Sequence, residues 1–506
     1  MFYVFLKENK KTLDKKNSSY KQIVKSTGIF GGVQVINTII GIVRNKLGAI
    51  LLGPDGIGII SIYQNIVDLI RSVSSLGINT GAVRDIASSE DKGRQVYVIS
   101  VFRWWVTLTS CLGCLICLVF CYPISLWAFD GNSNYTLPVA LLSVAVFFLT
   151  LSAGQSTILQ GLRMISLMAK ASLLGNVAGL IISIVFYCLL GLKGIVPAFV
   201  LSGIILFFFT NSYVRKIQIP KITIEHSIAL EKGISNLKLG LYIVSVSILN
   251  TASMFLVRSF LVQTLDLTSV GIFSAVWTLT TTYPALILNS MGSDFFPRLC
   301  SVSNSNTNTK KLVNEQTYIA LVTIIPIMLV MILFSKYILY FFYSSQFMVA
   351  ESLLQWQIIG GFFKVLSWPL AFIMLAKGKG AYHLLAEIVF YVIYLGCSYF
   401  LFPYYGLFAF GMGYLLAYVA YLFVVFFVGI KLCSFGWNKQ NIRLSVVGIV
   451  VIVLAIAIQL YVEQYQWFIS LLLCLVTFVY AIVMFNKVFD IRELIDKLRK
   501  KISNRD

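Results

Sequence analysis

Apolar residues recur along the chain in runs of about 20, from Gly28 to Phe485. A helical run of this length crosses the roughly 30 Å hydrocarbon core of a bilayer. Backbone N–H and C=O groups find no water in hydrocarbon, so only helices or closed β-barrels span it, and these continuous runs lack the alternation of barrel strands. The pattern therefore predicts an all-α polytopic membrane protein.

We expect about fourteen membrane-spanning helices, joined by connections too short to hold a soluble domain. Their predicted ranges are 28–51, 57–82, 99–122, 136–159, 169–190, 194–213, 239–264, 269–292, 317–342, 352–375, 381–402, 405–430, 444–462 and 465–485.

These ranges group into two six-helix lobes followed by two more helices. A weak internal repeat supports the grouping, because the segment around Arg44 and Gly58 aligns with the segment around Arg258 and Gly271. Six helices separate the copies, so both have the same orientation and the lobes are pseudo-symmetric. The predicted organisation is a basic cytoplasmic tail (1–25), an N-terminal lobe (26–214), a cytoplasmic linker (215–238), a C-terminal lobe (239–432), two additional helices (443–485) and a second basic tail (486–506).

Composition supports the membrane assignment, and the distribution of charge predicts the orientation. Of the 506 residues, 58% are hydrophobic and 12% are charged, and the formal net charge is +20. Lysines and arginines gather in both termini and in alternate connections, whereas intervening connections such as FDGNSN at 129–134 carry almost none. This positive-inside bias predicts that both termini are cytoplasmic, and it explains the basic charge without a nucleic-acid partner.

One face of the predicted helix 57–82 is polar. The residues on this face are Ser61, Gln64, Asn65, Asp68, Arg71, Ser72, Ser75 and Asn79, which cover an arc of about 120° at 100° per residue. Lipid does not solvate Asp68 or Arg71, so the stripe is expected to face a hydrated cavity. The alternative is an Asp68–Arg71 ion pair that only locks helices together.

Among the other charges within predicted helices, the candidates for function are Arg44, Arg258, Lys364 and Glu387. Arg44 and Arg258 lie close enough to helix ends to reach the outer interface, whereas Lys364 is near the middle of its helix. Cations around a cavity suit an anionic ligand such as phosphate. Glu387 is a candidate proton or sodium site, and a neutral structural glutamate is the alternative.

The stretch CLGCLICLVFCYP at 111–123 has the cysteine spacing of a bacterial iron–sulfur motif. A cluster needs its thiolates gathered by a loop, whereas one membrane helix spreads these cysteines over roughly 15 Å. We therefore expect a packing stripe. Since no Walker sequence, metal-ligand set or catalytic nucleophile is found either, we expect a transporter with no cofactor or metal, and not an enzyme.

Three stretches carry a resemblance to a known family. They are GPDGIGIISIYQ (53–64), FFPRLCS (295–301) and QWQIIGGFFKVLSWPLAFIMLAKGKGAYHLLAE (355–387). They resemble the polysaccharide-transporter family of the multidrug/oligosaccharidyl-lipid/polysaccharide flippase superfamily, in particular the O-antigen and enterobacterial-common-antigen flippases. Lys364 matches the lysine of the family's G-x-x-x-K stretch.

The resemblance implies a V-shaped bundle that works by alternating access. The transported substrate would be an O-antigen repeat unit linked to undecaprenyl diphosphate. The transporter would move it from the cytoplasmic to the periplasmic leaflet of the bacterial inner membrane. Polysaccharide polymerase and chain-length proteins would be partners. On this hypothesis, Arg44, Arg71, Arg258 and Lys364 hold the diphosphate, and Asp68 and Glu387 couple the cycle to H⁺ or Na⁺.

Three alternative functions remain open. An ion-coupled multidrug antiporter of the same superfamily would need a cavity rich in acids and aromatic residues, whereas buried cations outnumber buried acids here. A peptidoglycan-precursor flippase would also have a cationic cavity, and loss of its gene would be lethal. A polysaccharide polymerase or ligase would carry a large periplasmic loop, which the pattern does not show.

Overall fold

The computed structural model describes residues 2–486 except 76, 90, 221, 223–225 and 462–464. The predicted basic tail at 486–506 lies outside the described residues apart from Asn486, and so do four positions of the predicted linker.

Within the described part, the chain consists of helices joined by short connections, and none of its residues forms a strand. The first elements are α1 (Phe2–Ser75), α2 (Ile78–Ser88), α3 (Lys92–Val119), α4 (Cys121–Ala128), η1 (Ser133–Tyr135), α5 (Thr136–Gly161), α6 (Ile165–Leu190), η2 (Gly191–Gly194), α7 (Ile195–Arg215) and α8 (His226–Thr264). They are followed by α9 (Leu267–Trp277), the π-helical η3 (Thr278–Thr282), α10 (Tyr283–Ser301), α11 (Asn306–Leu333), α12 (Ser335–Phe342), η4 (Ser345–Ala350), α13 (Glu351–Ala376), α14 (Gly380–Tyr405), η5 (Gly406–Phe408), α15 (Ala409–Cys433), α16 (Lys439–Tyr461) and α17 (Gln466–Asn486).

Ten stretches of the described residues are long and apolar enough to cross a membrane. Three of them contain two helices each, because η2 separates α6 from α7, η5 separates α14 from α15, and a kink divides α1. Most described residues of the predicted ranges are helical, but three ranges contain a break: 57–82 at Gly77, 99–122 at Phe120 and 317–342 at Phe334. The all-α polytopic membrane fold is confirmed, and the total of fourteen crossings stays a prediction.

The kink in α1 lies at Gly53, between the first two predicted spans. Gly53 has φ 68° and ψ −171°, which a residue with a Cβ rarely adopts, and Pro54 follows it. Proline lacks an N–H and crowds the preceding turn, so the helix bends here and a second helix begins. The segment 54–75 is the one that carries the polar stripe.

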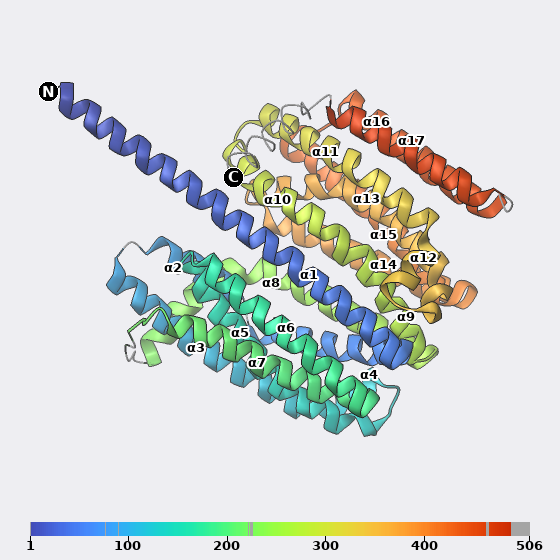
Figure 1. Ribbon diagram of the computed structural model, residues 1–506, viewed down its shortest axis with the longest axis horizontal. Helices are drawn as coiled ribbons and strands as arrows, with labels where there is room; N and C mark the ends of the chain where they lie inside the picture. The colour runs from blue at the N-terminus through green and yellow to red at the C-terminus, as the bar shows by residue number, and fades with distance from the viewer. Residues whose placement is uncertain are drawn as a thin grey trace, which may run out of the picture. The chain divides into compact units, whose positions relative to one another are not determined.

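Helix packing divides the chain into two compact units, Met1–Gly271 and Ile272–Asp506. In unit 1, α6 packs against α7 and α1, and α5 packs against α3 and α7 (Figure 1). In unit 2, α15 packs against α13 and α14, and α16 and α17 pack against α11 (Figure 1). The predicted lobes divide earlier, at 215–238, whereas α8 packs against α1, α2 and α3 and so belongs to unit 1.

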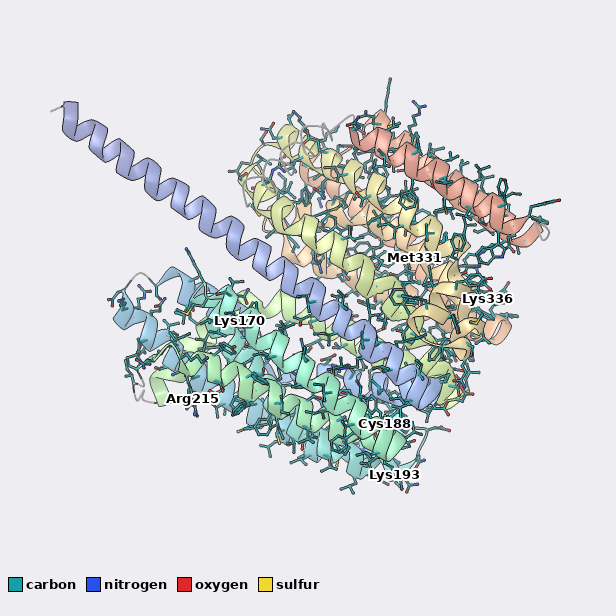
Figure 2. All side chains as sticks on the ribbon, in the orientation of Figure 1. Lys170, Cys188, Lys193, Arg215, Met331 and Lys336 are labelled. Carbon is teal, nitrogen blue, oxygen red and sulfur yellow. The ribbon has the colours of Figure 1, made fainter. Side chains whose placement is uncertain are left out.

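Basic residues of α6 and α7 lie at opposite ends of these helices. Lys170 and Arg215 are near one end and Lys193 is at the other, beside Cys188 (Figure 2). Lys170 and Arg215 thus lie at the end of the helices that the charge distribution assigns to the cytoplasm. Lys193 is an exception to the positive-inside pattern, because it lies at the end assigned to the outside.

The two glycines of the internal repeat touch each other. A Cβ added to Gly58 would lie 2.3 Å from the carbonyl oxygen of Leu267 and 3.2 Å from the backbone nitrogen of Gly271. Only residues without a side chain allow two backbones to approach this closely. The repeat signal in the sequence therefore marks a contact between the helix 54–75 and the start of α9.

The cysteines of 111–123 do not form one stripe, because α3 ends at Val119 and α4 begins at Cys121. Cys117 is buried and its thiol donates to the carbonyl of Val139 on α5 at 3.4 Å, whereas Cys111 is exposed. The packing prediction holds for Cys117 and is wrong for Cys111. All nine cysteines are free, and the described residues contain no group of three or more metal-ligating side chains.

The glycine contact gives a stability prediction. Gly58→Ala should lower the free energy of unfolding by about 1–3 kcal/mol, because the methyl group meets backbone that is unable to swing aside. Gly41→Ala, on the part of α1 before the kink and with nothing within 4 Å of its Cβ position, should be neutral or slightly stabilising. Thermal unfolding midpoints of the purified proteins test this, and equal midpoints for the two variants would refute the contact.

Candidate functional site

A polar cavity of about 290 Å³ lies within unit 1, beside the segment 54–75 of α1. We call it the stripe cavity. It is lined by Asp68, Arg71, Ser72, Ser75, Asn79, Thr150, Ala153, Ser247 and Thr251, which come from α1, α2, α5 and α8. Eight of these nine side chains are polar or charged, in a bundle whose other surfaces are apolar. The cavity therefore suits water and polar ligands and not a lipid chain.

Asp68 and Arg71 form an ion pair at the cavity wall. Arg71 Nη1 lies 3.7 Å from Asp68 Oδ1, and Arg71 Nη2 donates to the carbonyl of Leu149 at 3.4 Å. Gln64 Nε2 donates to Asp68 Oδ2 at 3.0 Å. The side chains are 29% exposed for Arg71 and 40% for Asp68, so the pair is open to the cavity and not sealed between helices.

Arg71 keeps unused hydrogen-bonding capacity. Its Nε is buried and has no hydrogen-bond partner among the described residues. A guanidinium has five N–H donors, and both contacts that Arg71 makes are long for charge-assisted hydrogen bonds. Because Nε is buried, the donors that an anion entering the stripe cavity could reach are the remaining Nη hydrogens of Arg71.

The first three residues of the predicted stripe lie outside the cavity lining, and one of them, Asn65, bonds α8. Asn65 is 5% exposed, and its Nδ2 donates to the carbonyl of Thr251 at 3.2 Å. Ser61 Oγ donates to the carbonyl of Gly58 at 2.8 Å. Ser61, Gln64 and Asn65 are absent from the lining of the cavity, whereas Asp68, Arg71, Ser72 and Ser75 belong to it.

The stripe cavity does not gather the other predicted cations of unit 1. Arg44 packs over Gly179 of α6, where an added Cβ would lie 3.2 Å from Arg44 Nη2, and Arg44 Nε is buried without a partner among the described residues. Arg258 is half-buried on α8. Neither side chain lines the cavity, so their role in holding a diphosphate stays a prediction.

Lys364 and Glu387 lie in unit 2 within a group of tyrosines. We call Lys364, Glu387, Tyr414, Tyr418 and Tyr421 the lysine–tyrosine cluster. Lys364 Nζ of α13 lies 5.6 Å from the ring centroid of Tyr418, and the hydroxyl of Tyr421 donates to Glu387 Oε1 at 2.9 Å. Tyr418 and Tyr421 are three residues apart on α15 and thus link Lys364 to Glu387. Both charged side chains are half-buried, and tyrosines of α15 cover part of each one.

The sequence analysis missed the tyrosines of this cluster. Tyr414, Tyr418 and Tyr421 come from α15, and the rings of Tyr414 and Tyr418 are 4.7 Å apart. Their spacing of four and three residues puts them on one helix face, which is a readable signal. The spacing shows that the three tyrosines share a helix face. The packing of α15 against α13 and α14 is needed to show that this face meets Lys364 and Glu387.

Comparison with known proteins identifies the family of this chain. A model of the family described as "Polysaccharide biosynthesis protein" matches residues 23–303. The chain belongs to this family. This agrees with the resemblance carried by the three sequence stretches, and the match includes the whole polar stripe of α1.

Named relatives of the chain are flippases. It is 22% identical over 392 residues to the lipid III flippase of Escherichia coli K12, a match covering 75% of this chain and 92% of that protein, and a Shigella flexneri lipid III flippase gives the same values.

The same fold occurs in solved transporter structures. The lipid II flippase MurJ in an inward closed conformation matches with a TM-score of 0.67 at 16% identity, covering 92% of this chain and 99% of that one. An inward-facing multidrug resistance MATE transporter of the MOP superfamily matches with a TM-score of 0.62 at 16% identity, covering 83% and 94%. The chain has the fold of this superfamily, and its named relatives are transporters and not enzymes, as expected.

Hydration of the stripe cavity predicts thiol reactivity. In a background without the nine native cysteines, Ser75→Cys should react with a charged, membrane-impermeant thiol reagent, because water lets the thiol ionise. Ile181→Cys, in the middle of α6 and 56% exposed on an apolar surface, should stay unlabelled in the membrane. Mass spectrometry of labelled membranes measures both, and an unreactive Cys at 75 would contradict a hydrated cavity.

Proposed function

We propose that this protein is a flippase for a lipid-linked oligosaccharide. The observation that carries the proposal is Arg71, which is held in a polar cavity on a membrane helix with an unsatisfied donor, in a chain of the polysaccharide biosynthesis protein family. A lipid-linked sugar has one strongly anionic part, the diphosphate that joins sugar to lipid. That part needs a cation in the membrane interior, and the lipid tail does not.

Arg71 is suited to bind such a diphosphate and to release it again. Asp68 lies 3.7 Å from Arg71 Nη1 and holds the guanidinium loosely, so phosphate oxygens can compete for the same donors. Transport requires release of the diphosphate. A cation that is partly neutralised when no substrate is bound holds the diphosphate less tightly than a free cation would. The ion pair between Asp68 and Arg71 forms again when the diphosphate leaves.

The volume of the stripe cavity limits what it holds. A space of about 290 Å³ accommodates a diphosphate with some water, and it is too small for an oligosaccharide as well. We therefore assign the diphosphate alone to this cavity. The sugars would move along a larger polar path that opens and closes by alternating access.

The lysine–tyrosine cluster supplies a second cation and a group that can bind a coupling ion. Glu387 accepts a hydrogen bond from Tyr421, and Lys364 lies near the ring of Tyr418 on the same helix. Binding of H⁺ or Na⁺ at Glu387 would remove the negative charge that balances Lys364. Lys364 would then attract an anion more strongly, which links ion binding to substrate binding.

The finer assignment is an undecaprenyl-diphosphate-linked O-antigen repeat unit, moved from the cytoplasmic to the periplasmic leaflet of a bacterial inner membrane. The alternation of basic connections supports cytoplasmic termini. The relative of E. coli is named for a lipid-linked substrate, lipid III. Polysaccharide polymerase and chain-length proteins would act on the product at the outer face.

Removal of either cation tests the proposal. Arg71→Gln and Lys364→Gln should each reduce surface polysaccharide by about tenfold or more in a host that depends on this gene, since a lost charge-assisted hydrogen bond costs roughly 1.5–3 kcal/mol. Lys193→Gln, which removes an exposed cation from η2, should leave surface polysaccharide unchanged. Glycan blots and membrane levels of each variant provide the readout.

Two results would count against this assignment. Normal surface polysaccharide in both the Arg71 and Lys364 variants, with normal amounts of each variant in the membrane, would rule out the cationic site. Lysis on loss of the gene, instead of survival without surface polysaccharide, would favour a peptidoglycan precursor as the substrate.

A further inference from the structure

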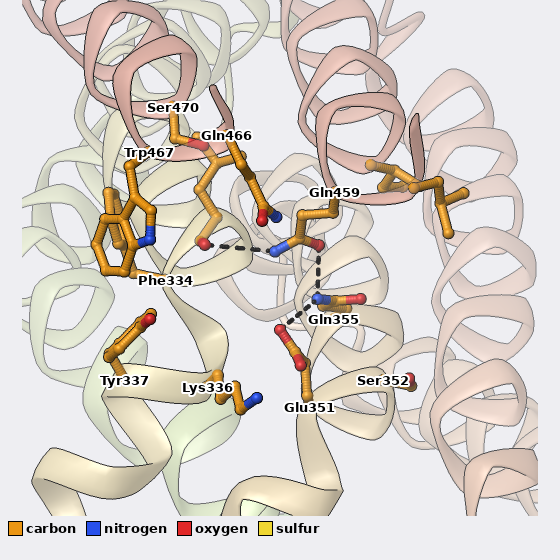
Figure 3. A pocket seen from close by; sticks show the side chains of 13 residues that line it. Phe334, Lys336, Tyr337, Glu351, Ser352, Gln355, Gln459, Gln466, Trp467 and Ser470 are labelled. Carbon is orange, nitrogen blue, oxygen red and sulfur yellow. Dashed lines mark hydrogen bonds between the residues drawn. The ribbon is translucent and has the colours of Figure 1, made fainter. Parts of the chain in front are cut away.

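A second polar cavity lies wholly within unit 2, where the last two helices meet α12 and α13. Its volume is about 360 Å³, and we call it the terminal-helix pocket. Its walls include Lys336, Tyr337, Glu351, Gln355, Gln459 and Trp467 (Figure 3). It shares no residue with the lysine–tyrosine cluster, so the proposed transport mechanism leaves it without a role.

One wall of the pocket is aromatic. Trp467 of α17 lies beside Tyr337 of α12, with ring centroids 4.6 Å apart and planes at 55°, and Phe334 lies 5.6 Å from the same tryptophan (Figure 3). Trp467 is 52% exposed. A large part of the indole surface is therefore open to a ligand.

The opposite wall is a chain of hydrogen-bonded side chains. Gln355 Nε2 of α13 donates to Gln459 Oε1 of α16 at 2.6 Å and lies 3.5 Å from Glu351 Oε1 (Figure 3). Gln459 Nε2 in turn donates to the carbonyl of Ile332 at 2.7 Å. These bonds fix the orientation of both amides before any ligand arrives.

Polar atoms of this wall remain available to a ligand. No hydrogen bond of the described residues uses Gln355 Oε1 or the second carboxylate oxygen of Glu351, and Lys336 at the rim is exposed. Polar atoms on a membrane helix cost free energy when they stay unpaired, so these unused atoms favour a ligand in the pocket. The pocket thus combines an open aromatic surface with oriented acceptors and donors.

We propose that the terminal-helix pocket binds a pyranose sugar. A pyranose presents a face of C–H bonds that packs on an aromatic ring and an edge of hydroxyls that need donors and acceptors. Here Trp467 and Tyr337 take the C–H face, and Gln355, Glu351 and Lys336 take the hydroxyls. About 360 Å³ is at the lower end of small-molecule pockets, which fits roughly one or two sugar rings.

The location of the pocket indicates where the sugar comes from. Glu351 is the first residue of α13, and the pocket also includes the end of α16 and the start of α17. With cytoplasmic termini, these helix ends lie on the periplasmic side. The sugar would then belong to a lipid-linked oligosaccharide after translocation or to a free periplasmic glycan. The site goes beyond the proposed transport and does not depend on which substrate is flipped.

Direct binding tests the pocket. Full-length protein in lipid nanodiscs, free of glucoside and maltoside detergents, is titrated with methyl glucopyranoside, N-acetylglucosamine and maltose while saturation-transfer NMR follows the sugar. We expect saturable binding of at least one of them. Trp467→Leu and Gln355→Leu should each weaken it about tenfold, which corresponds to about 1.4 kcal/mol.

Phe468→Leu is the matched control, since Phe468 adjoins Trp467, is 71% exposed and does not line the pocket. It should bind sugar like the unmodified protein. No saturable binding of any sugar, or binding that neither Trp467→Leu nor Gln355→Leu weakens in well-folded protein, would overturn the proposal. The side chain of Trp467 is half exposed, so its loss should not prevent folding.

The source of the sugar is distinguished by competition. A polyprenyl diphosphate carrying the same sugar, added to the nanodiscs, should displace the free glycoside if the pocket takes the lipid-linked form. Binding of the free glycoside that this lipid does not displace would support the site with a free glycan as its ligand. Transport by the cavity variants is a separate measurement, so failure of either proposal is recognisable on its own.

Discussion

Hydrocarbon offers no partner to a charge, and this constraint governs how the polar residues of the chain are arranged. Asp68 and Arg71 would be untenable on a helix that faces lipid. In unit 1 they face each other at 3.7 Å, and α5 and α8 supply a backbone carbonyl and hydroxyl groups around them. The hydrated space that results is both the condition for burying the pair and the place where an anion can be held.

The same constraint is met differently in unit 2. Lys364 lies near the ring of Tyr418 and Glu387 accepts a hydrogen bond from Tyr421, so α15 supplies a partner to each charge. Gln355 donates to Gln459, and Gln459 donates to the carbonyl of Ile332. In both units, polar side chains thus find at least some of their partners on neighbouring helices. The polar residues therefore mark the positions where helices are obliged to meet.

The sequence predicted the helices, the family and the polar face of α1 because each depends on a local pattern or on composition. It did not predict the lining of the stripe cavity, since Thr150 and Thr251 come from helices far along the chain and look like ordinary membrane hydroxyls. Asn65 shared the arc of Asp68 and yet packs against Thr251. A helical arc identifies a face, whereas the neighbouring helices decide which part of that face stays hydrated.

The central claim is that Arg71 holds the diphosphate of a lipid-linked sugar during its passage across the membrane. It is tested most directly by flipping of a fluorescent polyprenyl-diphosphate oligosaccharide in proteoliposomes, followed by quenching from the outside. Protein with Arg71 should make both leaflets accessible to the quencher, and protein with Arg71→Gln should leave the inner half protected, as in protein-free vesicles. Equal rates for the two proteins would contradict the account.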